Sequence, residues 1–237
     1  MKPTLSTLLS FNGGYVDTAG YLVFQGLFTA HVTGNFVTLA AALIHGTSGV
    51  IAKLLALPVF CAVILITRLV SFNLPQRGLP VLATMLTLKL VLLSVGAALA
   101  IWHGPFADGD SYYAIATGLI LVAAMAIQNA VHRIHMPSMP PTTLMTGTTT
   151  QIMIDLADMV HGLPAGETAT RARLGRMAVA VVSFAAGATA AALLLAKVGS
   201  WCFLLPPLIA LWTRLMAGTV SMVAGGASPP PAPAQVR

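Results

Sequence analysis

Charged side chains are scarce in this chain of 237 residues, where Asp, Glu, Lys and Arg together make up only 8%. A soluble domain carries about 25%, so the composition excludes an ordinary water-soluble fold. Hydrophobic residues reach 57% instead. Several apolar runs approach the roughly 20 residues that a helix needs to cross a bilayer. The sequence therefore predicts an all-α membrane protein.

Other absences exclude whole classes of site. The chain has two cysteines, Cys61 and Cys202, and both lie in apolar runs, as is typical of small buried hydrophobes. It has no clustered Cys/His metal site, no phosphate-loop lysine motif and no dinucleotide fingerprint. Its basic residues are scattered and do not form a patch with aromatics. We therefore expect no metal, no cofactor and no nucleic-acid partner, and a protein that is not an enzyme.

The apolar runs predict a single polytopic membrane domain over 1–224. A tail of Gly, Ala, Ser and Pro follows at 225–237, and we expect it to be disordered because it cannot bury a core. Two further segments, 34–45 and 147–161, are too short to cross. The six spanning helices are predicted at about 6–27, 51–72, 81–102, 113–131, 174–196 and 200–223.

The charges in the loops predict which side each loop faces. Loop 103–112 carries Asp108 and Asp110 but no Lys or Arg, whereas loops 73–80, 132–141 and 162–176 carry arginine. The positive-inside rule then places both termini in the cytoplasm. Lys53 and Lys197 fall on the outer side and oppose this scheme.

The scheme requires the two short segments to turn back to the side from which they came. Each would be a re-entrant half-helix, 34–45 from outside and 147–161 from inside. The chain would then consist of two inverted repeats of three spans, repeat A over about 6–102 and repeat B over about 113–223.

A threonine-glycine motif opens each short segment. The first break, residues 29–35, reads Thr-Ala-His-Val-Thr-Gly-Asn, and the second break, residues 142–148, reads Thr-Thr-Leu-Met-Thr-Gly-Thr. Each follows an apolar helix with an isolated polar group, Asp17 in one and Gln128-Asn129 in the other. A duplicated helix break inside hydrophobic sequence points to the binding site of a transporter.

These motifs, together with Gly14-Tyr15-Val16-Asp17, resemble those of the YoaK-like family of bacterial inner-membrane proteins. The resemblance covers about Leu8 to Val223. It implies a six-helix bacterial membrane protein, and it supplies no substrate because the family has no settled biochemical function.

The two breaks are the predicted substrate site. Thr33 and Thr146 are good N-caps, Gly34 and Gly147 allow close backbone approach, and Asn35 and Thr148 follow directly. Unpaired N–H groups at two helix starts would attract an anion or the negative end of a polar solute. Alternatively, both breaks are structural and are closed by threonine hydroxyls.

Three charges at membrane depth complete the prediction. Asp17 is either a proton- or cation-coupling group or the partner of Lys89 or Arg214 in a buried ion pair, which we favour. Lys89 and Arg214 would favour an anion, or else clamp carbonyl groups. The amides of Gln128 and Asn129 either contact the solute or join helices.

Two further polar features have competing interpretations. One face of 147–161 lines an inner vestibule or belongs to an amphipathic helix on the cytoplasmic surface. His31 is a satisfied polar group rather than a proton-linked switch. The polar residues of the 147–161 face are Thr148, Gln151, Asp155 and Asp158.

The leading hypothesis is a secondary transporter or facilitator for a small polar, anionic solute, with the lipid bilayer and that solute as partners. A non-transporting scaffold or sensor that binds a protein or lipid is the alternative. A serine hydrolase built on Ser48 ranks third, because the match is only four residues long. The sequence leaves a homo-oligomer open.

Overall fold

The computed structural model describes residues 4–143, 145–162 and 167–225. Within these ranges the chain is all-helical, with eight α-helices, three short 3-10 helices and no strand. The predicted all-α class is confirmed. The prediction of a disordered tail falls, apart from Gly225, outside the described residues.

The helices coincide with the segments that the sequence analysis treats as helical. Four ends differ by four residues or more. The first helix stops at Val23 and not near residue 27, and the fifth ends at His135 and not near residue 131. The seventh begins at Glu167 and not near residue 174, and the eighth begins at Leu205 and not near residue 200. The bounds are α1 Leu5–Val23, α2 Asn35–His45, α3 Val50–Asn73, α4 Val81–His103, α5 Tyr112–His135, α6 Met145–His161, α7 Glu167–Val198 and α8 Leu205–Gly225.

Four stretches are long and apolar enough to cross a membrane. They are Val50–Asn73, Val81–His103, Tyr112–His135 and Thr168–Ala217, the last of which runs through α7 and α8. Such stretches are what a bilayer requires of a spanning helix. The chain is therefore a membrane-like helical protein.

Helix α1 is not among these four stretches because its sequence is too polar. It carries polar residues that would be costly against lipid, but the protein buries them: Ser10 and Asn12 are fully buried, and Asp17 is 5% exposed. Helix α5 is likewise central, with two thirds of its apolar window buried. Polar groups on α1 and α5 can therefore serve the interior of the bundle.

The central helices pack closely against later segments of the chain. Helix α1 packs along α7, and α5 packs between α3 and α4. Glycine permits the α1–α7 approach, since a Cβ at Gly14 would lie 2.1 Å from the carbonyl oxygen of Phe184. A Cβ at Gly187 would lie 2.0 Å from the carbonyl oxygen of Phe11. Residues of α1 and α7 thus approach backbone to backbone.

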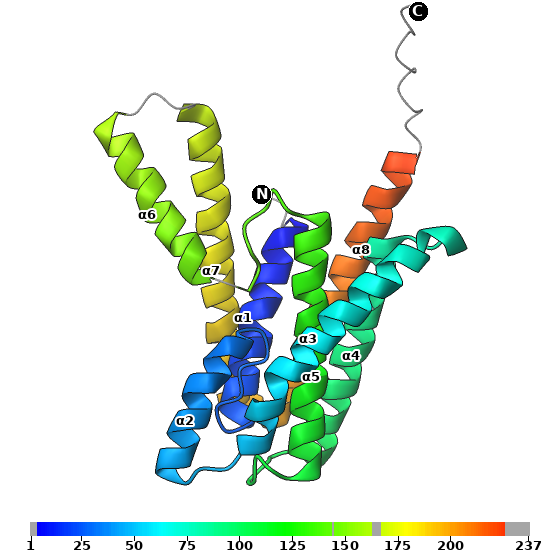
Figure 1. Cartoon of the computed structure of the whole chain (residues 1–237), viewed down its shortest axis with the longest axis vertical. Coiled ribbons are helices and arrows are strands. Elements are labelled where there is room, and N and C mark those ends of the chain that lie inside the picture. The colour runs from blue at the N-terminus through cyan, green and yellow to red at the C-terminus, as the bar shows by residue number, and fades with distance from the viewer. Residues whose placement is uncertain (1–3, 144, 163–166, 226–237) are drawn as a thin grey trace, which may run out of the picture.

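The two short helices start deep in the molecule and run outward in opposite directions. Figure 1 shows α2 running from the middle of the molecule to the lower end, and α6 running from the middle to the upper end. Helix α2 packs on α3, and α6 packs on α7. After α1 the chain reverses at Gln25 and Gly26, which both have positive φ, and this turn ends α1 before the predicted boundary.

The loop before α3 and the loop before α5 are hydrogen-bonded to each other at the lower end of the molecule in Figure 1. The carboxylate of Asp110 accepts the N–H groups of Gly49 and Ile51 at 2.9 Å each and so caps the start of α3. The ammonium of Lys53 donates to the carbonyl of Ser48, and the Lys53 side chain is buried. Lys53 counted against the predicted orientation of the chain in the membrane. In the structure its ammonium stabilises this loop.

Candidate functional site

The first break is organised around the carboxylate of Asp17. Its Oδ1 accepts the backbone N–H groups of Thr29, Ala30 and His31 at 2.8, 2.7 and 3.2 Å. Backbone donors at a helix interruption need a partner at membrane depth, where lipid supplies none. An internal anion thus already occupies the place where the sequence analysis expects the negative end of a solute.

Asn35 and Gly34 hold the shape of the same break. The Asn35 side chain accepts the N–H of Phe28 and donates to its carbonyl, both at 2.8 Å. Gly34 lies against the Phe28 ring, where a Cβ would be 2.8 Å from Cδ2. Thr33 differs from both because its side chain is exposed and lines a cavity. Of the predicted triplet, only Thr33 presents its side chain to open space.

The second break is held by amides instead of a carboxylate. Gln128 Nε2 donates to the Thr142 hydroxyl at 3.1 Å and to the Leu9 carbonyl at 2.9 Å. The Thr143 hydroxyl donates to Asn129 Oδ1 at 2.6 Å. A polar side chain inside the preceding long helix therefore fastens the loop at both breaks.

The two predicted cations, Lys89 and Arg214, lie apart from Asp17. The Lys89 ammonium, which is fully buried, donates to Gln128 Oε1 at 2.5 Å. The Nε of Arg214 donates to the Thr87 hydroxyl at 2.7 Å. The ion pair that we favoured for Asp17 is wrong: neither Lys89 nor Arg214 bonds to it in the described part of the chain. Lys89 supports the second break through Gln128.

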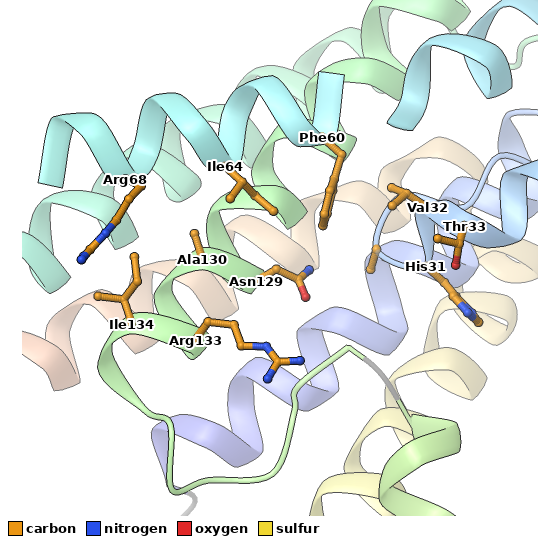
Figure 2. Close-up of a pocket in the computed structure, with 11 residues that line it drawn as sticks. His31, Val32, Thr33, Phe60, Ile64, Arg68, Asn129, Ala130, Arg133 and Ile134 are labelled. Carbon is orange, nitrogen blue, oxygen red and sulfur yellow. The ribbon is translucent and has the colours of Figure 1, made fainter. Parts of the chain in front are cut away.

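Two cavities adjoin the breaks. The first encloses about 380 Å³ between α3, α5 and the first break. Figure 2 shows Asn129 and Arg133 extending from α5 toward His31 and Thr33. The opposite wall consists of residues from α3, namely Phe60, Ile64 and Arg68.

The second cavity, of about 450 Å³, joins the two breaks. Its walls include His31 from the first break and Thr146, Gly147 and Thr148 from the second. His31 and Arg133 line both cavities. Five predicted residues line the two cavities: Thr33, Asn129, Thr146, Gly147 and Thr148, of which Thr148 is buried. Five others have structural partners in the interior: Asp17, Gly34, Asn35, Lys89 and Gln128. The eleventh, Arg214, makes an exposed contact with Thr87.

Comparison with known families matches residues 5–216 to the model described as "Protein of unknown function (DUF1275)". The chain belongs to this family. No curated protein and no solved structure matches the chain. The family establishes kinship over almost the whole helical region and assigns no reaction or ligand.

In this DUF1275 chain, sequence reasoning missed Arg133 as a site residue and treated it as part of a cytoplasmic loop. It lies in the last turn of α5, and its side chain is exposed. The guanidinium makes no hydrogen bond or ion pair within the ranges that the structure describes. The available signal was spacing, because Asn129 and Arg133 are four residues apart and share one helix face.

The polar face of α6 is used against α7. Asp155 binds the Arg173 guanidinium through both oxygens, at 2.6 and 2.9 Å, and accepts a hydrogen bond from Gln151 at 2.7 Å. Arg173 first, and Gln151 next, hold the pKa of the Asp155 carboxyl below its usual range. Neighbouring side chains cover Asp155, while Arg173 is 51% exposed. This contact explains why α7 continues as a helix beyond its apolar part.

Proposed function

We propose that the protein is a secondary transporter or facilitator for a small polar, anionic solute. The supporting observation is the cavity lined by His31 of the first break together with Thr146, Gly147 and Thr148 of the second. Interrupted helices that point their starts at a common cavity are typical of substrate sites in secondary transporters. Arg133, which lines this cavity without a partner in the described residues, would favour an anion there.

We also propose six spanning helices and two re-entrant half-helices in two inverted repeats. The packing supports this, because exchanging α1 with α5, α2 with α6, α3 with α7 and α4 with α8 preserves the pattern of neighbours. Helix α1 packs on α7 as α5 packs on α3, and α2 packs on α3 as α6 packs on α7. The opposite directions of α2 and α6 in Figure 1 agree with the same exchange.

The proposed location is the bacterial inner membrane, with both termini cytoplasmic. Helix α1 begins and α8 ends toward the same end of the molecule, and the α5–α6 connection, which follows Arg133, lies at that end too. Arginines on one side match the positive-inside rule. We propose no enzymatic activity and no cofactor. The Ser48 hydroxyl accepts the N–H of Gly109 at 2.9 Å, a loop contact that accounts for this serine without catalysis.

A non-transporting scaffold is the second candidate, and the first break favours it. The side chains of Asp17 and Asn35 already hydrogen-bond the backbone groups of residues 28–31. A tightly packed, purely structural break would require such internal partners. Its partner would be a protein or lipid that contacts the outside of the bundle. The two candidates differ in whether water reaches the second break.

Uptake into proteoliposomes tests the proposal directly. The purified full chain would be reconstituted and tested for uptake of labelled small anions, with liposomes lacking the protein as a control. In parallel, cysteine would replace Thr146, which is exposed and lines the cavity, and Leu211, which is exposed on the apolar surface of α8. A transporter requires labelling of the Thr146 position by an aqueous thiol reagent and poor labelling at Leu211. No flux for any anion, combined with an unlabelled Thr146 position, would leave the scaffold as the better account.

A further inference from the structure

The cavity between α3 and α5 combines an apolar wall with two arginines, Arg68 and Arg133. Phe60 and Ile64 on α3 and Ile134 on α5 supply apolar surface. The Arg133 guanidinium faces this space and has no hydrogen-bond or ion-pair partner among the described residues. A cavity that is mostly apolar and has few placed polar groups is typical of a small-molecule site.

The other charged groups near this site lie differently. The Arg68 guanidinium also lines the cavity, but it lies over the Phe72 ring, 4.2 Å from its centroid, away from Arg133. Lys89 binds Gln128, and the Asp17 carboxylate is occupied by backbone N–H groups. No carboxylate of the described residues lines the cavity. The Arg133 guanidinium therefore suits a negative group, and the fork of an arginine matches a carboxylate.

The cavity volume limits the size of the ligand. A volume of 380 Å³ corresponds to about a dozen waters at roughly 30 Å³ each. A bare inorganic anion would leave the apolar wall uncovered, whereas the hydrocarbon body of a short carboxylate would cover part of it. The exposed hydroxyl of Thr33, which lines the same cavity, offers a further donor.

We propose that this cavity binds a small organic monocarboxylate, with its carboxylate on Arg133 and its apolar body against Phe60, Ile64 and Ile134. The inference rests on the proposed transport function and names the class of its solute. Sulfate and phosphate are excluded by the same reasoning, because they carry too much charge and too little apolar surface for this wall.

Isothermal titration of the full chain in detergent provides the test. Hexanoate should bind, while hexanol, which lacks the charge, and sulfate, which lacks the apolar body, should bind about tenfold more weakly or worse. Among acetate, butyrate and hexanoate, affinity should rise severalfold per methylene, up to about fourfold at full burial. Equal affinity for sulfate and hexanoate, or no dependence on chain length, would overturn the assignment.

Substitutions locate the binding in this cavity. Arg133→Gln should weaken hexanoate binding about tenfold or more, whereas Arg77→Gln, at an exposed arginine outside the cavity, should leave it unchanged. If Arg133→Gln does not fold, Phe60→Ala serves instead, and it should weaken hexanoate more than acetate. Unchanged hexanoate affinity in a folded variant of either residue contradicts the proposal.

A long-chain fatty acid tests whether the carboxylate comes from a soluble short-chain acid or from a membrane lipid. Oleate titrated in lipid nanodiscs should bind more weakly than hexanoate, since its chain exceeds the cavity. Tighter oleate binding would overturn the short-chain assignment and indicate a membrane fatty acid. Binding is measured independently of flux: hexanoate binding without uptake refutes the transporter and keeps this site, whereas uptake of other anions without hexanoate binding refutes only the site.

Discussion

Replacing Asp17 by asparagine removes one charge at the centre of the first break while keeping the size of the side chain. Oδ1 of Asp17 accepts three backbone N–H groups at 2.7–3.2 Å. A hydrogen bond to a charged group contributes about 1.5–3 kcal/mol and a neutral one about 0.5–1.5 kcal/mol. The difference is about 1 kcal/mol per bond, so Asp17→Asn should cost about 3 kcal/mol.

The measurement is the free energy of unfolding in mixed detergent micelles. Asp158→Asn is a matched control, because Asp158 is exposed and the substitution changes the same functional group. It should change stability by less than about 0.5 kcal/mol. Asp17→Ala should cost more than Asp17→Asn, since it leaves buried N–H groups without an acceptor. A loss below about 0.5 kcal/mol for Asp17→Asn would refute the carboxylate's role in holding the break.

Three further outcomes follow from other contacts. Gly14→Ala should destabilise the protein by about 1–3 kcal/mol through overpacking, while Gly147→Ala, where a Cβ meets nothing within 4 Å, should be near neutral; equal effects in thermal unfolding would contradict this. A double-mutant cycle of Lys89→Met and Gln128→Leu should give a coupling energy of about 1.5–3 kcal/mol, and zero coupling would dismiss their bond. Because its folded pKa is lowered, Asp155 stabilises α6 against α7 above about pH 4, and this is lost as pH falls through the lowered pKa; hydrogen exchange in α6 should accelerate on acidification, and Asp155→Asn should remove that dependence.

The helices were predictable because long apolar runs and glycine breaks are local features. All eight α-helices follow such runs or begin beside the threonine-glycine motifs. The end of α1 was misplaced because the reversal at Gln25 and Gly26 requires positive φ at both residues, which the apolar pattern does not reveal. The extension of α7 depends on Arg173 meeting Asp155, a contact between separate helices.

The candidate site was only partly predictable, because a polar residue in a span shows that it needs a partner but not which one. Asp17 was expected beside a cation, yet the nearest donors are N–H groups of the loop that folds back onto α1. The Lys89 ammonium on α4 instead donates to the side-chain amide oxygen of Gln128 on α5. Arg133 was overlooked because only the folded chain shows that it lines a cavity and has no partner among the described residues.

The backbone-to-backbone seam between α1 and α7 has a consequence for biosynthesis. The first helix leaves the ribosome early, but Gly14 meets its partner surface only after Phe184 has been made. During that interval Asn12 lacks the carbonyl of Pro206, to which its side chain donates, and the enclosure that the finished bundle provides. The weakly hydrophobic helix α1 is therefore made long before the helix that covers it. A chain truncated before α7 should be degraded faster than the full chain.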